Sequence, residues 1–350
     1  MKKTLLTICL VWMCFSLSAQ KIIDLSGKWS FSIDRQDNGE KEKWFSHTLN
    51  DCINLPGSMP EKLKGDEVTA KTQWTGSLYD SSYYYNPYME KYRKEGNIKF
   101  PFFLTPDKHY VGAAWYQKEV NIPADWKGER ILLFLERPHI ETTVWVNGQK
   151  TGMQNSLCVP HQYDITHYVR PGKCTITIRV DNRIKEINVG PDSHSITDQT
   201  QGNWNGIVGR ICLQTTPKTY FDDIQIYPEP EQKLARVKVV IKGTGTAKVK
   251  LSAESFNTDK KHIVPAIQQE IKLNKGVTET EMVLPMGNDM LLWDEFHPAL
   301  YKLKAEVTNG KKTEIKEIQF GMRRFEIKGK WFYVNGRKTQ LRGTVENCDF

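Results

Sequence analysis

The sequence has few cysteines for its length, and they are widely spaced. Seven occur among 350 residues, and none forms a C-x-x-C pair, so neither a zinc site nor a dense disulfide framework is indicated. The histidines are scattered too, without metal-ligand spacing. We therefore expect no metal and no cofactor. We expect Cys174 and Cys212, which lie in strand-like runs, to be buried free thiols.

A basic patch and a long hydrophobic run are also lacking. The formal net charge is +8, but Lys and Arg are interspersed with 41 acidic residues, whereas a nucleic-acid-binding protein carries a basic stripe or patch. A membrane helix needs about 20 apolar residues, and the apolar run at 5–17 is shorter. We expect no nucleic-acid partner and no membrane span.

The first residues have the layout of a secretory signal peptide. Lys2 and Lys3 form a basic start, the apolar run follows, and Ser18 and Ala19 supply the small residues of a cleavage site. We predict a signal peptide at 1–19, cleavage after Ala19, and export of the mature chain to the periplasm or the cell exterior.

A long amphipathic helix is absent from the pattern, and the apolar residues repeat every two positions instead. Such alternation is typical of half-buried strands, and it recurs at 175–180, 237–241, 249–253 and 303–307. Asn-Gly pairs between strand-like runs indicate tight hairpins, because both residues tolerate positive φ; they are Asn147-Gly148, Asn309-Gly310 and Asn335-Gly336. The pattern predicts an all-β protein of sandwiches.

A domain boundary is predicted near Pro217-Lys218. From there to about Phe320, some seven short strands in about 100 residues match the size of an immunoglobulin-like sandwich. A further unit then begins with a hairpin, for which strands are predicted at 331–334 and 339–342.

Four groups of residues are more specific than a generic β pattern. In chain order they are Asp24-Leu-Ser-Gly-Lys-Trp-Ser-Phe31 with Leu55-Pro-Gly-Ser58; Trp115-Tyr116 to Val120 with Thr143-Val-Trp-Val-Asn-Gly148 and Ile178-Arg-Val-Asp-Asn182; Asn203-Trp-Asn-Gly-Ile-Val-Gly-Arg210; and Phe320-Gly-Met-Arg-Arg324 with Tyr333-Val-Asn-Gly336 and Leu341-Arg-Gly343. In this order and spacing the set resembles glycoside hydrolase family 2, the group of β-galactosidases, β-glucuronidases and β-mannosidases. The resemblance covers about 23–350.

The resemblance implies three domains. They are a jelly-roll (galactose-binding-like) sugar-binding sandwich at 20–218, the immunoglobulin-like sandwich at 219–320, and the start of a truncated (β/α)8 barrel at 321–350, with Leu341-Arg-Gly343 in its first strand. Catalysis in this family implies two glutamates at the ends of barrel strands; a retaining enzyme needs their carboxyl groups about 5–5.5 Å apart. A barrel takes roughly 250 residues. We therefore expect no catalytic residue in this chain, the glutamates being expected downstream of Phe350, and we expect the chain alone to be inactive.

Other carboxylate groupings are weaker candidates for chemistry. Glu279 and Glu281 share a strand face and Asp222-Asp223 are adjacent, and both pairs are typical of solvated strand and turn charges. The segment 193–198 contains Ser, His and Asp, but it lacks the strained elbow and the oxyanion donors that a nucleophilic serine needs.

Part of a sugar pocket is predicted in the loop 198–205. By the resemblance, this loop supplies polar groups over the barrel mouth. Asp198 and Asn203 can hydrogen-bond hydroxyl groups and Trp204 can stack on a pyranose; alternatively, Trp204 belongs to the core and Asp198 caps a turn. Glu346 and Asn347 are further substrate-binding candidates. The run 344–349 differs from the N-[RK]-[HE] run of better-known members, which leaves the sugar open.

A tyrosine-rich loop from Tyr79 to Tyr110 is a second candidate. Aromatic faces suit sugars and tyrosine adds a hydroxyl group. The alternative, which we favour, is that these residues fasten a long insertion to the sandwich. Its aromatic residues are Tyr79, Tyr83, Tyr84, Tyr85, Tyr88, Tyr92, Phe100, Phe102, Phe103 and Tyr110.

Two rival hypotheses remain beside the front portion of an exported β-galactosidase-like glycosidase. One is a stand-alone carbohydrate-binding protein that lost its barrel; against it, a bare first barrel strand invites aggregation. The other is a structural adhesion protein of two sandwiches, which gives no reason for the ordered motifs.

Overall fold

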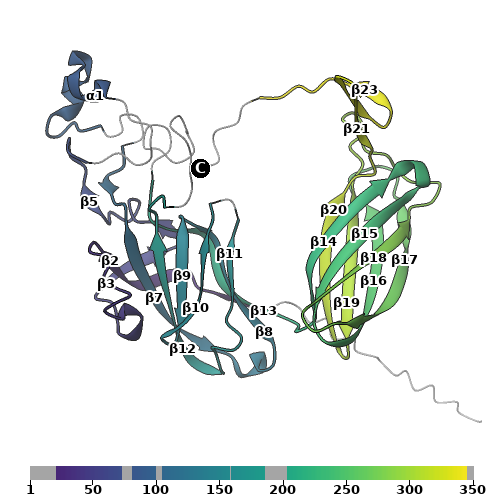
Figure 1. Ribbon diagram of the computed structural model, residues 1–350, viewed down its shortest axis with the longest axis horizontal. Helices are drawn as coiled ribbons and strands as arrows, with labels where there is room; N and C mark the ends of the chain where they lie inside the picture. The colour runs from purple at the N-terminus through teal and green to yellow at the C-terminus, as the bar shows by residue number, and fades with distance from the viewer. Residues whose placement is uncertain (1–20, 73–80, 100–104, 158, 186–202, 345–350) are drawn as a thin grey trace, which may run out of the picture. The chain divides into compact units, whose positions relative to one another are not determined.

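The computed structural model describes residues 21–72, 81–99, 105–157, 159–185 and 203–344. The predicted signal peptide therefore lies outside the described residues. The chain divides into two compact units between Thr216 and Pro217, and each contains a pair of antiparallel sheets (Figure 1). The prediction of an all-β protein is confirmed. Among the described residues, no helix is long and apolar enough to cross a membrane.

The first unit contains two main sheets. One has the order β1-β13-β8-β11, with β4 also paired to β13; its strands are β1 (Ile22–Asp24), β4 (Gly57–Ser58), β8 (Arg130–Pro138), β11 (His161–Asp164) and β13 (Gly206–Thr216). The other has the order β10-β9-β12-β7-β2-β3; its strands are β2 (Gly27–Asp34), β3 (Asp51–Leu55), β7 (Ala113–Ile122), β9 (Glu141–Val146), β10 (Gln149–Asn155) and β12 (Gly172–Asp181).

Short elements complete this unit. They are the two-stranded sheet of β5 (Asp66–Glu67) and β6 (Lys108–His109), the helix α1 (Ser82–Tyr85), and the 3-10 turns η1 (Trp44–Ser46), η2 (Pro87–Arg93) and η3 (Ala124–Trp126).

The core of the first unit lies between its two main sheets. Alternation in β12 turns Ile176, Ile178 and Val180 into this core, where each is fully buried. Leu133 of β8 and Leu213 of β13 enter it from the other sheet. The period of two in the sequence is therefore the cause of the two-layer packing.

The opposite face of the six-stranded sheet is buried as well. Trp115 and Trp145 lie on that face, at most 2 % exposed, and their ring centroids are 4.9 Å apart. The segment 35–49 between β2 and β3, the covering segment, packs over them. Phe45 from this segment stacks on Trp145 at 5.2 Å and 6°.

One carboxylate anchors the start of the covering segment. Asp34, 3 % exposed, accepts hydrogen bonds from the backbone N–H groups of Asn38 (2.9 Å) and Gly39 (2.8 Å) and from Trp115 Nε1 (2.9 Å). A Cβ atom at Gly39 would lie 2.5 Å from Trp115 Nε1. Only glycine lets the backbone approach the indole this closely.

The second unit holds the seven strands predicted for it, in a three-stranded and a four-stranded sheet. The first has the order β14 (Tyr220–Glu229), β15 (Leu234–Lys242), β18 (Val277–Pro285), and the second β17 (Ile263–Leu273), β16 (Gly245–Ser255), β19 (Tyr301–Asn309), β20 (Lys312–Phe320). The turn η4 (Pro230–Gln232) joins β14 to β15. Alternating side chains such as Val237, Val249 and Leu303 fill the core between the sheets.

All three predicted Asn-Gly hairpins are confirmed. Asn147-Gly148 joins β9 to β10, and both residues have positive φ, 50° and 78°. Asn335 and Gly336 likewise have positive φ, 50° and 79°. Between β19 and β20 the turn moves on by one residue: Asn309 still pairs with Lys312 in the ladder, and Gly310 takes the positive φ.

The hairpin after residue 320 is shifted from its predicted position. It forms a three-stranded sheet of β21 (Phe325–Lys328), β22 (Trp331–Val334) and β23 (Arg337–Thr339). The prediction of a strand at 339–342 is wrong: pairing ends at Thr339, and 340–344 are in no strand. The tight turn at 335–336 fixes the register and places Thr339 opposite Phe332. Because β22 begins at Trp331, the ladder can continue at most one residue beyond Thr339.

Truncating a covering-segment side chain should destabilise the first unit. Leu49, 6 % exposed, packs with the buried tryptophans, so Leu49→Ala should lower the free energy of unfolding by about 2–4 kcal/mol. Leu63→Ala, at a side chain 63 % exposed, is the control and should cost about 0.5 kcal/mol or less. Urea unfolding followed by tryptophan fluorescence measures both; equal effects would show that the segment does not seal the sheet.

Candidate functional site

Several strands of the first unit end at one edge of its two sheets. At this edge β12 ends at Asp181, where it pairs with Ala113, the first residue of β7. The turn from β8 to β9 lies beside them: the His139 N–H donates to Gly206 O (3.2 Å) and the Ile140 N–H to Asp181 O (3.4 Å). We call residues 110–113, 137–141, 181–183 and 203–206 the strand-end rim.

Three buried asparagines hold the rim together: Asn182, Asn203 and Asn205, all at most 3 % exposed. Asn182 Nδ2 donates to Tyr110 O and to Asn203 Oδ1, both at 2.9 Å, and Asn203 Nδ2 donates back to Asn182 O at 2.9 Å. Asn205 Nδ2 donates to Gly112 O and Val180 O. Their amide groups therefore replace the backbone ladder where the strands separate.

Gly206 lets β13 begin against β4. Its φ is +145°, and an added Cβ would lie 2.5 Å from Gly57 O. A side chain here would separate the two backbones. The glycine of the sequence motif at 206–210 therefore has a packing reason.

Trp204 is partly buried at the rim and pairs with His139. The two rings stack with centroids 4.4 Å apart and planes 19° apart. Burial lowers the pKa of His139 to about 4, although the Asn203 side chain raises it in part. The imidazole is therefore neutral at physiological pH. Its Nε2 atom is buried.

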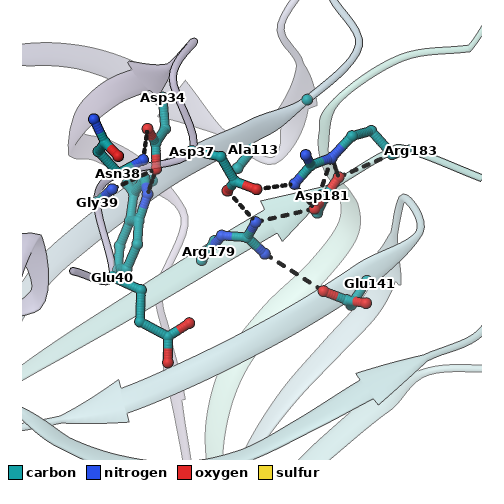
Figure 2. Close-up of polar contacts among 12 residues, drawn as sticks. Asp34, Asp37, Asn38, Gly39, Glu40, Ala113, Glu141, Arg179, Asp181 and Arg183 are labelled. Carbon is teal, nitrogen blue, oxygen red and sulfur yellow. Dashed lines mark hydrogen bonds and ion pairs between the residues drawn. The ribbon is translucent and has the colours of Figure 1, made fainter. Parts of the chain in front are cut away.

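An ion cluster lies on the covered side of the rim (Figure 2). Asp181, fully buried, accepts from Arg179 (3.0 Å), Arg183 (2.5 Å) and Lys185 (2.8 Å). Asp37 of the covering segment pairs with both arginines, at 2.6 and 2.7 Å.

Glu141 completes this ion cluster. It lies 3.4 Å from Arg179 and 3.0 Å from Lys185, so three carboxylates face three cations. Burial by itself would raise the pKa of Asp181, but hydrogen bonds from Arg183 and Lys185 together outweigh it and hold the pKa well below its usual range. The carboxylate therefore stays ionised through the physiological pH range.

Asp181 and Asn182 link the two networks, because Asp181 is the last residue of β12 and Asn182 follows it directly. Asp181 points into the ion cluster, whereas Asn182 points into the asparagine network. The rim is thus fixed from both sides of the six-stranded sheet. Nothing in the described ranges groups three or more His, Cys, Asp or Glu side chains as a metal site.

Comparison with known families assigns both units. Residues 22–217 match the family model "Glycosyl hydrolases family 2, sugar binding domain", and residues 219–323 match "Glycosyl hydrolases family 2". The chain belongs to glycosyl hydrolase family 2.

Curated relatives in family 2 are glycosidases. The chain is 24 % identical over 350 residues to a β-glucuronidase of Paenibacillus borealis, covering 94 % of this chain and 50 % of the relative. It is 23 % identical to human β-glucuronidase (93 % and 48 %) and 23 % identical to the β-galactosidase large subunit of Latilactobacillus sakei (91 % and 49 %). The chain spans about half the length of these relatives.

Solved structures agree in fold. A β-glucuronidase from Ruminococcus gnavus in complex with D-glucuronic acid matches with a TM-score of 0.61 at 18 % identity, covering 93 % of this chain and 50 % of that one. A β-glucuronidase from an uncultured Clostridium matches with a TM-score of 0.60 at 20 % identity, covering 92 % and 48 %. At these identities the likeness concerns the fold.

Of the predicted substrate-binding residues of this family 2 chain, two are described. Asn203 is 3 % exposed and both ends of its amide bond Asn182, a placement that favours a structural role. Trp204 is partly exposed beside His139. Asp198, Glu346 and Asn347 lie outside the described residues.

The tyrosine-rich loop is braced from within. Tyr83, 2 % exposed, donates its hydroxyl to Tyr92 O (3.0 Å), and Arg93 donates to Tyr83 O. Tyr85 and Tyr88 are 73 % and 83 % exposed and therefore do not fasten the loop. Tyr79, Phe100, Phe102 and Phe103 lie outside the described residues.

The alternative pair Glu279 and Glu281 forms ion pairs at the surface. Glu279 lies 2.7 Å from Lys238 and Glu281 lies 3.2 Å from Arg236, across the β15–β18 ladder. Each carboxylate forms an ion pair with a side chain of the neighbouring strand, which agrees with the prediction that these are solvated strand charges. Cys174 and Cys212 are buried and free, which confirms that prediction; burial raises the pKa of Cys174 to about 11.

Sequence reasoning missed His139 and the ion cluster. A lone histidine in Arg137-Pro-His-Ile140 has no motif around it, and its partner Trp204 is distant in sequence. The ion cluster could have been predicted from the sequence. Arg179, Asp181 and Arg183 alternate with other residues, a spacing that places charged side chains on one face of a strand whose other face is apolar.

Removing the Asp181 charge should destabilise the first unit in a pH-dependent way. Asp181→Asn leaves the cations of the cluster under-compensated and should cost about 3 kcal/mol near neutral pH. The folded pKa of Asp181 is lowered, so its stabilisation is present above the unfolded pKa of about 3.9 and is lost as pH falls toward the folded value. The difference between wild type and variant should therefore narrow below about pH 4.

The measurement is the free energy of unfolding in urea from pH 3 to pH 8. Asp125→Asn is the control, since Asp125 pairs with Lys21 at the surface, and little change is expected. A gap that stays constant with pH would mean that Asp181 does not carry its charge in the folded protein.

Proposed function

We propose that the described residues form the carbohydrate-binding portion of an exported family 2 glycoside hydrolase, which cleaves β-linked glycosides with retention of configuration. The match of 22–217 to the family's sugar-binding domain supports this proposal. The observation that carries it is the strand-end rim, where buried amide groups hold the backbone and Trp204 stays partly exposed. An aromatic face supported in this way suits the apolar face of a pyranose.

The relatives indicate the substrate class. They are named β-glucuronidases and β-galactosidases, so we propose a terminal β-linked hexopyranose, either a uronic acid or a neutral sugar. Both present several hydroxyl groups and one apolar face. The described residues would bind and orient this sugar.

We propose that the hydrolytic carboxylates lie outside this 350-residue chain. Retention needs one carboxyl group as acid and base and a second as nucleophile, about 5–5.5 Å apart. Of the carboxylates weighed from the sequence, Asp222, Glu279 and Glu281 are each engaged in a cross-strand ion pair, and Asp223 accepts hydrogen bonds from Ile224 N–H and Gln225. Neither pair is arranged as a general acid beside a nucleophile.

The domain assignments follow from the same proposal. The first unit is a jelly-roll sugar-binding domain, the second an immunoglobulin-like spacer, and the residues from 321 onward begin a (β/α)8 catalytic domain. The small sheet β21–β23 is then the entry to that domain.

Binding without hydrolysis is the first test. The 350-residue chain should bind methyl β-D-glucuronide or methyl β-D-galactoside in isothermal titration and should release no nitrophenolate from the corresponding nitrophenyl glycosides. Trp204→Ala should weaken binding about tenfold. Trp44→Ala, at a comparably exposed tryptophan of the covering segment, should leave binding unchanged. Absence of binding by the wild type would contradict the proposal.

Export is tested separately. We propose that residues 1–19 direct secretion and are removed, because they carry a basic start, an apolar run and a small-residue cleavage site. Expression with native residues 1–19 in a Gram-negative host should give a periplasmic or secreted chain whose N-terminal sequence begins at Gln20. Recovery of an uncleaved chain in the cytoplasm would refute the signal peptide.

A further inference from the structure

The segment that follows the second sandwich is strongly basic. Residues 321–344 contain seven Lys and Arg residues and one acidic residue, Glu326. The interspersed charge that the whole sequence predicts is therefore wrong for this segment. A surface with charge of one sign attracts ligands of the opposite sign, so the placement of these basic side chains decides whether they can act together.

The sheet β21–β23 separates apolar from basic side chains. Successive residues of a strand alternate between the two faces, and residues paired across strands share a face. From the register of the sheet, one face carries Phe325, Ile327 and Phe332. We call the opposite face, together with the turn residue beside it, the lysine face; its residues are Glu326, Lys328, Lys330, Trp331, Tyr333 and Lys338.

Trp331 holds two ammonium groups of the lysine face. Lys338 Nζ lies 3.2 Å from the centroid of its ring and Lys330 Nζ lies 5.4 Å from the ring, within the distance at which a cation is attracted to an aromatic face. Both lysines are exposed, and within the described part of the chain neither forms an ion pair. Two uncompensated positive charges are therefore gathered around one side chain.

The single carboxylate of the lysine face is already engaged elsewhere. Glu326 lies 2.6 Å from Arg324 and 3.3 Å from Lys328, and its side chain is only 17 % exposed. It therefore compensates those two cations and not the pair at Trp331. Lys330 and Lys338 remain available to an external anion.

The hairpin that carries this face is fixed to the second unit. The Arg324 N–H donates to Asn335 Oδ1 and the Asn335 N–H donates to Arg324 O, both at 2.8 Å. Asn335 Nδ2 donates to Trp293 O at 2.9 Å, and Arg337 pairs with Glu295 at 2.7 Å. The lysine face is therefore presented by an ordered element, which reduces the conformational entropy lost on binding.

We propose that the lysine face is a binding surface for a sulfated polysaccharide, one sulfate group of which is bound by Lys330 and Lys338 together. A sulfate ester presents three terminal oxygen atoms and an ammonium group has three N–H donors, so one sulfate can accept hydrogen bonds from both lysines. The lysine face belongs to the second unit, whereas the strand-end rim belongs to the first. The inference therefore does not depend on the function proposed for the rim.

Nucleic acid is the other common polyanion, and the aromatic rings argue against it. Single-stranded nucleic acid is bound by stacking of its bases on open aromatic faces. Here Lys338 covers a face of Trp331, and Lys328 lies over Tyr333 at 5.3 Å, so the rings hold ammonium groups instead. The match of residues 22–217 to a sugar binding domain also favours a carbohydrate.

The experiment measures binding of the 350-residue chain to heparin, the probe for a sulfated polysaccharide, by surface plasmon resonance over a range of salt concentrations. Fully desulfated heparin and single-stranded DNA are the comparison ligands. The variant is Lys330→Gln with Lys338→Gln. The control is Lys272→Gln with Lys275→Gln, which removes the same charge from exposed side chains at the end of the second sandwich opposite η4. Thermal unfolding shows that the variants are folded.

The wild type and the control variant should bind heparin, and both should bind desulfated heparin about tenfold more weakly. Lys330→Gln with Lys338→Gln should lose about tenfold in affinity for heparin at an unchanged melting temperature, because both side chains are exposed. Binding to a polyanion releases counterions, so the slope of log affinity against log salt should fall by about two, roughly one for each ammonium group removed.

Other outcomes overturn the inference. An equal loss in the control variant would mean that heparin responds to the total charge and not to this face. Equal binding of desulfated heparin would exclude sulfate recognition, and tighter binding of single-stranded DNA would make nucleic acid the partner. Full affinity in Lys330→Gln with Lys338→Gln would place any heparin site elsewhere. Binding of methyl glycosides at the rim is measured separately, so each of these results leaves the proposed function untouched.

Discussion

The buried carboxylate of Asp181 is the constraint on which the rim depends. Charge in a protein interior is tolerated only when it is paired and hydrogen-bonded, and Asp181 meets that condition through Arg179, Arg183 and Lys185. Because Asp37 joins the same arginines, the covering segment and the end of β12 are ordered together. The next residue, Asn182, carries that order through the sheet to the amide network on the other side. Electrostatic pairing on one face thus fixes the polar geometry on the other.

Some side chains at the rim have all their polar groups hydrogen-bonded within the protein, whereas others keep exposed surface. The three asparagines satisfy backbone groups where the sheets separate, and they are inaccessible for that reason. Trp204 and His139 lie next to them, and both keep some exposed area. In the sugar-binding role that we propose, such a rim would need little reorganisation when a ligand binds, because its buried amide groups already fix the backbone.

The sequence predicts the strands and the tight turns well, but it predicts poorly the residues whose roles depend on contacts with distant parts of the chain. Period-two runs such as 175–180 and the Asn147-Gly148 turn are local signals, and the structure confirms them. The expected strand at 339–342 failed because pairing depends on a partner and a register that lie elsewhere. The roles of Asn203 and His139 depend on neighbours across the fold, Asn182 and Trp204. Whether a side chain is buried and hydrogen-bonded depends on the tertiary structure, so no local sequence motif predicts it.

The covering segment is part of a hairpin, and its ends are the paired strands β2 and β3. Little chain entropy is therefore lost in laying it over the sheet, since closing a loop between neighbouring strands costs less than bringing in a distant one. Its removal, by the same reasoning, cannot occur as the swing of an independent flap: uncovering Trp115 and Trp145 pulls on the ladder at the edge of the six-stranded sheet and on the Asp37 pairs at the rim. Local opening at this edge and loss of order at the rim should therefore be a single cooperative event.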